Sequence, residues 1–117
     1  MARHDDAVRL RHMLDYAREA VALSHGRTRS EIDSDRIFNL AMTRLVEVIG
    51  ESAARLSEAT RQAHPQIPWP QVVAARNRLI HGYDQINYDI LWDIIELDLP
   101  PLIEQLEEIV GPDDAAG

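Results

Sequence analysis

Five residues with side chains suited to phosphate chemistry lie within one eight-residue stretch, RNRLIHGY, of this 117-residue chain. They are Arg76, Asn77, Arg78, His81 and Tyr83. An imidazole can accept or donate a proton near neutral pH, because its ordinary pKa is about 6.5. A guanidinium stays charged and presents forked donors that fit phosphoryl oxygens. The stretch therefore indicates acid–base chemistry beside a phosphate group.

The expected position of Arg76 and His81 on one short helix raises a geometric problem. A helix turns by about 100° per residue, so the two side chains would point roughly 140° apart on a regular helix. They could act on one atom if His81 lies in a last, loosened turn before Gly82, or if two copies of the chain face each other. We expect both arrangements together.

The same residues also have a purely structural interpretation. A histidine just before a helix-ending glycine commonly hydrogen-bonds the last carbonyls and interacts favourably with the helix dipole. Arg76 could likewise pair with one of the 20 acidic side chains of the chain. The residues alone leave both interpretations open, and they leave Arg78 as either a phosphate contact or a solvated charge.

Apolar periodicity predicts two long helices in the first half of the chain. The first covers residues 5–24 and ends at Gly26, which suits a helix terminus. Residues 27–35 are expected to form a loop, and Ser34 is expected to cap a second helix that reaches about residue 60. The stripe expected to face the core from this second helix consists of Ile37, Leu40, Leu45, Val48, Ile49 and Leu56.

Prolines and a capping asparagine divide the second half of the chain. The three prolines within residues 65–70 interrupt any helix there, and a third, shorter helix is expected from about residue 70 to His81. Asn87 can cap a fourth helix, which the Pro100-Pro101 pair is expected to kink or split. Trp69 is expected to fill a gap in the core.

These elements predict an all-α fold in the form of an antiparallel four-helix up-and-down bundle. One domain is expected over residues 1–110, followed by a disordered tail over residues 111–117. No segment approaches the roughly 18 apolar residues of a membrane-spanning helix, and the first residues lack the pattern of a secretory signal. A cytoplasmic protein without contact to a membrane is therefore expected.

The composition excludes some kinds of site. The chain has no cysteine, which excludes disulfides, thiolate nucleophiles and cysteine-based metal sites. The remaining histidines show no metal-ligand pairing, so neither a metal nor another cofactor is expected. The net charge of −8 argues superficially against a nucleic-acid partner, but the acidic excess lies in the second half of the chain and does not decide the question. Asp5 and Asp6 are expected to be solvated.

The motif and its surroundings resemble the HEPN superfamily, and within it the HepT-like proteins. The signature of that branch is R-x4-H-x-Y, and Arg76, His81 and Tyr83 match it position for position. Asn77 matches the polar residue that often follows the arginine. Three further stretches also resemble this family, namely VEVIGESAARLS in the second expected helix, IPW before the motif and the region of Trp92 after it. The resemblance covers about residues 5–110.

The resemblance implies a ribonuclease that cleaves RNA without a metal, by attack of a ribose 2′-hydroxyl on the adjacent phosphate. His81 would accept the proton of that hydroxyl or protonate the leaving oxygen. Arg76 would stabilise the charge that builds on the phosphoryl oxygens, and Asn77 would bind the phosphate or orient His81. Glu51, in the stretch IGES, is a candidate supporting residue, with an ordinary salt bridge as the alternative.

The HepT branch also implies partners. There, a nucleotidyltransferase antitoxin of the MntA type attaches AMP to the tyrosine of the motif, which is Tyr83 in this sequence. Added bulk and negative charge two residues from His81 would repel an RNA backbone. The chain is therefore expected to be the toxin of a toxin–antitoxin pair and a homodimer with two Arg76/His81 sets in one cleft. The alternative is a noncatalytic helical protein that binds and positions a nucleotidyltransferase.

Overall fold

The computed structural model describes residues 2–81 and 85–111, and the side chains of residues 5–80 and 85–111. It is predominantly helical, which confirms the predicted all-α class, and its described part adds only one two-stranded hairpin. Most of the predicted tail, residues 112–117, lies outside the described residues. The elements are α1 (Ala2–Ser24), α2 (Arg29–Ser34), α3 (Arg36–Ala54), α4 (Glu58–Ala63), α5 (Trp69–Val73), α6 (Ala75–Leu79), β1 (Ile80–His81), β2 (Gln85–Ile86), α7 (Tyr88–Asp93), the π-helix η1 (Ile94–Asp98) and α8 (Leu99–Val110).

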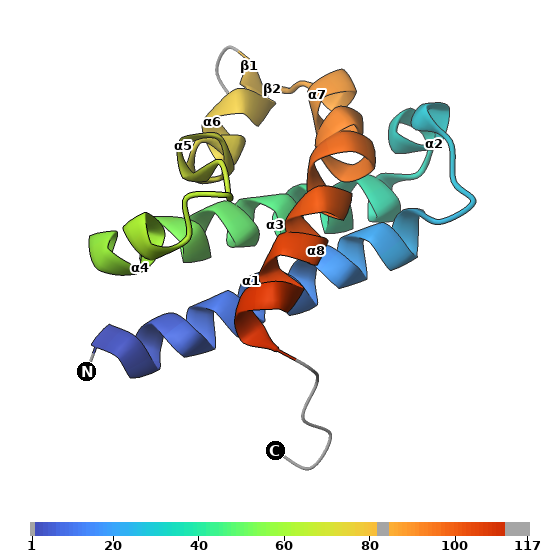
Figure 1. Ribbon diagram of the computed structural model, residues 1–117. Helices are drawn as coiled ribbons and strands as arrows, with labels where there is room; N and C mark the ends of the chain where they lie inside the picture. Colours follow the sequence, from blue (N-terminus) through green and yellow to red (C-terminus); the bar gives the residue numbers. More distant parts are fainter. Residues whose placement is uncertain (1, 82–84, 112–117) are drawn as a thin grey trace.

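The core lies between the three longest helices. α1 and α3 run antiparallel and pack side by side, and α8 packs across α1 (Figure 1). Their facing side chains are fully buried, among them Leu14 of α1, Met42 of α3 and Leu106 of α8. The up-and-down order of four helices stays a prediction, because two short helices, α5 and α6, stand where one continuous third helix was expected. No helix in the described part of the chain is both long and apolar enough to cross a bilayer.

The loop predicted over residues 27–35 contains a helix instead, α2. The Thr28 N–H donates to Glu31 Oε1 at 2.9 Å, as in a capping box, and Ile32 is buried beneath the helix. Ser34, the predicted cap of the next helix, ends α2. Asp35 caps α3, since its Oδ1 accepts from the Phe38 N–H at 3.0 Å. The prediction missed a local signal here, the T-x-x-E pattern.

The core-facing stripe of α3 differs from the predicted one. Ile37 and Leu40 are 81% and 51% exposed, although both were expected to face the core. The buried apolar stripe of this helix consists of Phe38, Met42, Val46, Ile49 and Ala53. The helix also ends at Ala54 instead of near residue 60, because Ser57 starts a new helix, α4, by accepting from the Thr60 N–H. The predicted stripe is therefore wrong at Ile37 and Leu40 and confirmed at Ile49 and Leu56, which are 2% and 3% exposed.

Asp6 is buried, contrary to the expectation that it is solvated. It is only 3% exposed, whereas Asp5 is exposed. Its carboxylate accepts from Ser57 N at 3.1 Å, Ser57 Oγ at 2.6 Å and Thr60 Oγ1 at 2.5 Å. α1 therefore supplies the acceptor that holds the first turn of α4.

The predictions for the third and fourth helices are confirmed only in part. Trp69 is buried, as expected, and its indole N–H donates to His64 O at 2.9 Å. The third helix breaks at Ala74 into α5 and α6 and ends at Leu79, before His81 is reached. Asn87 caps α7 as predicted, by accepting from Ile90 N at 3.1 Å. The chain then stays helical, and it changes to a π-helix just before the two prolines, which occupy the first turn of α8.

Candidate functional site

The short helix α6 and the hairpin after it position the motif. Ala75 and Leu79 of α6 are buried against the core, so Arg76 and Asn77 between them lie on the exposed side. The helix ends where Ile80 adopts an extended conformation and its N–H donates to Arg76 O. The Asn87 N–H then donates to Leu79 O at 2.7 Å, which closes the hairpin onto the end of the helix.

His81 lies in strand β1 and not in a loosened helical turn, so that prediction was wrong. Its Cα is paired with that of Gln85 in β2, and Ile80 is paired with Ile86. The angle calculated for a regular helix therefore does not apply to Arg76 and His81, because the chain leaves the helix between them. The side chain of His81 and all of Tyr83 lie outside the described part of the structure.

Arg76 is a half-exposed cation that is only loosely paired. Its side chain is 55% exposed, and its Nε lies 3.7 Å from Glu47 Oε2 on α3. That distance allows an ionic attraction but exceeds a hydrogen bond, and the guanidinium of Arg76 makes no hydrogen bond to the described residues. Within the described part of the chain, its forked donors are therefore not engaged in hydrogen bonds.

A chain of charged side chains continues from Arg76 along α3. Arg44 Nη1 lies 3.9 Å from Glu47 Oε1 and 3.7 Å from Glu51 Oε2. Glu51, the predicted supporting residue, thus contacts Arg44, and the structure places Glu47 beside Arg76. These two glutamates lie one helical turn apart, and a sequence alone does not say which of them meets the neighbouring helix.

Gly50 explains why α5 and α6 lie so close to α3. A Cβ added at this position would come within 3.2 Å of Val72 O and 3.6 Å of Val73 O, both in the backbone of α5. Only glycine allows this approach without a shift of the neighbouring chain. A glycine inside the apolar pattern of a helix is a sequence signal for such close packing.

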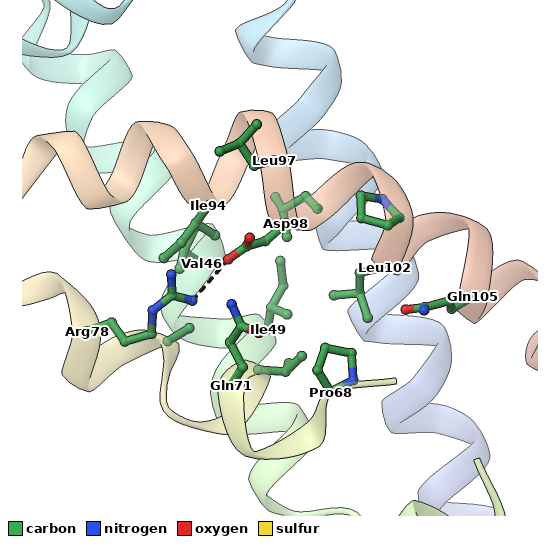
Figure 2. A pocket seen from close by; sticks show the side chains of 14 residues that line it. Val46, Ile49, Pro68, Gln71, Arg78, Ile94, Leu97, Asp98, Leu102 and Gln105 are labelled. Carbon is green, nitrogen blue, oxygen red and sulfur yellow. Dashed lines mark hydrogen bonds and ion pairs between the residues drawn. The ribbon is translucent and has the colours of Figure 1, made fainter. Parts of the chain in front are cut away.

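Arg78 occupies the opposite flank of α6 from Arg76. Its Nη1 lies 3.0 Å from Asp98 Oδ2 of η1, and this pair stands at the edge of a cavity of about 210 Å³ (Figure 2). The rest of the wall is largely apolar and includes Val46, Ile49 and Leu102. An RNA phosphate would have to compete with Asp98 for this guanidinium.

The described residues contain no group of three or more histidine and carboxylate side chains placed to hold a metal ion. Asn77 is exposed beside Arg76, with no side-chain hydrogen bond in the described part of the chain. The arrangement can therefore offer an anion the guanidinium of Arg76 and the amide of Asn77, next to the strand that carries His81.

Comparison with known proteins gives a consistent family. The sequence profile of the HepT-like family, described as ribonuclease HepT-like, matches residues 13–109. A candidate RNase of Methanocaldococcus jannaschii is 34% identical over 110 residues, which cover 94% of this chain and 91% of that protein. A candidate RNase of Caldanaerobacter subterraneus subsp. tengcongensis is 31% identical over 86% of this chain and 90% of its own length.

A third relative carries the family name itself. It is a candidate ribonuclease HepT of Thermococcus cleftensis, 31% identical over 75 residues, which cover 64% of this chain and 68% of that protein. No solved structure matches the chain significantly.

Proposed function

The chain belongs to the HepT-like ribonuclease family, and on that basis we propose that it is a metal-independent endoribonuclease that uses Arg76, Asn77 and His81. The observation that supports this choice of residues is the exposure and weak pairing of the Arg76 side chain. This side chain is 55% exposed, its guanidinium makes no hydrogen bond to the described residues, and Arg76 lies on the helix, α6, that leads into the hairpin with His81. A structural arginine would use its donors within the fold, as Arg78 does with Asp98.

In the proposed reaction, the ribose 2′-oxygen attacks the adjacent phosphorus and the bond to the 5′-oxygen breaks. An imidazole accepts the proton of the 2′-hydroxyl, and an acid protonates the leaving 5′-oxygen. Arg76 stabilises the extra negative charge on the phosphoryl oxygens, with Asn77 as a second donor. The products are a 2′,3′-cyclic phosphate and a 5′-hydroxyl.

We also propose that the protein works as a homodimer in which two Arg76/His81 sets share one cleft. Two His81 side chains would supply a base and an acid for one reaction, which a single imidazole cannot do at once. The nearly complete exposure of Ile37 on α3, at 81%, supports a second copy as a cover for this apolar side chain.

We also propose that a partner protein inhibits the ribonuclease. The chain would be the toxin of a toxin–antitoxin pair, and an MntA-type nucleotidyltransferase would inhibit it by attaching AMP to Tyr83. The added phosphate would carry negative charge close to the position of the RNA phosphate. Mass spectrometry of the protein after co-expression with its cognate nucleotidyltransferase tests this step, and an unmodified Tyr83 would contradict it.

Cleavage of labelled RNA in EDTA tests the central proposal. The parent protein, checked by mass to carry no AMP, is compared with Arg76→Ala and His81→Ala, both confirmed as folded by circular dichroism. Arg61→Ala serves as the matched control, because Arg61 lies on α4 and has no ion pair to the described residues. We expect cleavage by the parent and the control and its loss in the two site variants. An inactive parent would favour the noncatalytic partner of a nucleotidyltransferase.

A further inference from the structure

A hollow of about 480 Å³ lies between the first half of α3 and the segment that leads from β2 into α7. Its volume is within the range of small-ligand sites. Side chains from α3 and from the β2–α7 segment contribute to its wall. Those that matter here are Arg36, Asn39, Leu40, Thr43, Gln85 and Tyr88.

The polar groups of this hollow have unused hydrogen-bonding capacity. Thr43 Oγ1 is buried and has no hydrogen-bond partner, the one such side-chain atom among the described residues. A hydroxyl buried in this way costs stability unless a ligand satisfies it. Arg36 is exposed and has no ion pair with the described residues. Asn39 is buried and held by its Nδ2, which donates to Ile32 O at 3.1 Å, so its Oδ1 is the atom left for a ligand.

The hollow also has an apolar wall. Leu40 is 51% exposed there, and the half-buried ring of Tyr88 packs against the core from the other side. An aliphatic and an aromatic face suit a nucleobase, because every base has a flat π-face that stacks on such surfaces. In a chain with a net charge of −8, Arg36 is the only charged side chain that the described residues contribute to this wall. That charge favours a ligand with a phosphate.

The hollow lies next to the motif. Gln85, which contributes to its wall, is the strand partner of His81. Thr43 precedes Glu47 by about one helical turn of α3, and Glu47 in turn contacts Arg76. A nucleotide seated in the hollow would therefore lie beside the proposed position of the scissile phosphate.

We propose that this hollow binds one nucleoside of the RNA substrate, next to the bond that is cleaved. The base lies between Leu40 and Tyr88, the hydroxyl of Thr43 and the amides of Asn39 and Gln85 bond to its edge, and Arg36 contacts the flanking phosphate. The inference rests on the proposed ribonuclease function. It adds to that function a subsite that selects the base.

Binding of a short RNA that cannot be cleaved tests the subsite separately from catalysis. The probe is a fluorescein-labelled hexanucleotide with 2′-O-methyl groups throughout, which has no free 2′-hydroxyl, and its Kd is measured by fluorescence anisotropy for each of the four bases. Thr43→Val removes only the unpartnered hydroxyl. Arg36→Gln has a charge-matched control in Arg61→Gln, and Tyr88→Leu has a control in Tyr16→Leu, which changes a half-buried tyrosine of α1.

We expect Arg36→Gln to raise the Kd on the order of 10-fold and Thr43→Val about 3- to 10-fold, with a loss of base preference in Thr43→Val. Tyr88→Leu should raise the Kd at least about 5-fold through lost stacking. The two controls should stay within about 2-fold of the parent. Thr43→Val should not lower thermal stability, because it removes an unsatisfied group, so weak binding by this variant cannot be attributed to unfolding.

Three results would overturn the subsite. Equal losses in Arg36→Gln and Arg61→Gln would mean attraction by overall charge only. Unchanged affinity and base preference in Thr43→Val would mean that the Thr43 hydroxyl does not contact the RNA. Dissociation of a dimer by Leu40→Ser in sedimentation experiments, with RNA affinity unchanged, would make the hollow an interface between copies. A parent that binds the probe through these residues but never cleaves RNA would contradict the ribonuclease proposal and leave the subsite in place.

Discussion

Two charged side chains have opposite environments in this fold. Asp6 lies at the junction of α1 and α4, and Arg76 lies on α6. Asp6 is 3% exposed and accepts three hydrogen bonds from Ser57 and Thr60. Arg76 is 55% exposed and, among the described residues, has one ionic contact, at 3.7 Å to Glu47. The carboxylate of Asp6 is satisfied by hydrogen bonds within the chain, whereas the guanidinium of Arg76 makes no hydrogen bond to the described residues.

From this difference we expect Asp6 to affect stability and Arg76 to affect RNA cleavage. A buried carboxylate with three donors is costly to disturb, because its neighbours lose their acceptor as well. A loosely paired surface arginine contributes little to stability, since exposed ion pairs are typically worth less than about 1 kcal/mol. Substitutions at Asp6 should therefore change the free energy of unfolding, and substitutions at Arg76 should change RNA cleavage.

The largest expected effect is on catalysis at Arg76. Arg76→Ala should lower kcat for RNA cleavage by about 100- to 1,000-fold, because the phosphoryl charge loses its main donor. The free energy of unfolding, measured with urea, should change by less than about 0.5 kcal/mol. Arg76→Lys keeps the charge but loses the forked geometry, and it should recover only part of the activity. A marked loss of stability with unchanged cleavage would mean that Arg76 has a structural role, as Asp6 does.

The next effect is on stability at Asp6. Asp6→Asn should lower the free energy of unfolding by about 2 kcal/mol, because the amide accepts more weakly than the carboxylate and adds donors where Ser57 and Thr60 already donate. Asp5→Asn is the matched control, since it makes the same charge change at an exposed neighbouring position, and it should change stability by less than about 0.5 kcal/mol. Cleavage per folded molecule should be unaltered in both variants. A similar loss in the two variants would point to net charge instead of the hydrogen bonds.

The pH dependence of stability also tests the contribution of the Asp6 hydrogen bonds. Burial would raise the pKa of Asp6, but the hydrogen bonds from Ser57 and Thr60 outweigh it and hold the pKa below its ordinary value of 3.8. A lowered folded pKa means stability that is fully present above pH 3.8 and is lost as the pH falls through the lower folded value. The difference in unfolding free energy between the parent and Asp6→Asn should therefore be constant from about pH 5 to 7 and shrink below pH 3.8. A difference that grows on acidification would contradict this account.

Local signals made part of this structure predictable from sequence. Asn87 was identified as a cap and Trp69 as a core residue, because a capping side chain and a large ring next to prolines act over a few residues. The burial of Asp6 could not be predicted in this way, since its partners Ser57 and Thr60 lie more than 50 residues away. Its environment is fixed only when α4 docks against α1.

The site shows the same limit. The residues of the motif can be proposed from their types and spacing, but their arrangement depends on tertiary contacts. The exposure of Leu40 follows from which side of α3 is covered by α1, and the extended conformation at His81 follows from its pairing with Gln85. Glu47 is the neighbour of Arg76 because Gly50 lets α5 approach α3 closely. A periodicity argument contains none of these contacts.

Arg78 and Asp98 provide an intermediate case on the other flank of α6. The pair is half-buried with a 3.0 Å hydrogen bond, so it should contribute more to stability than Arg76 and less than Asp6. A double-mutant cycle with Arg78→Met and Asp98→Asn should give a coupling energy of about 0.5 to 1 kcal/mol in urea unfolding. Cleavage by folded Arg78→Met should stay within about 3-fold of the parent. A loss as large as that of Arg76→Ala would instead support Arg78 as a phosphate contact.

The smallest expected effect is at Glu47, and its direction decides what the residue does. Glu47 lies 3.7 Å from Arg76 without a hydrogen bond, so it competes weakly with a phosphate for the guanidinium. Glu47→Gln should then lower KM for RNA by about 2-fold, leave kcat unchanged and alter stability by less than about 0.5 kcal/mol. Glu51→Gln is the matched control, because it makes the same charge change one turn along α3 and contacts Arg44 instead of Arg76. A lower kcat in Glu47→Gln alone would mean that Glu47 positions Arg76 for catalysis, so that the loose pairing of Arg76 would itself be a part of the active site.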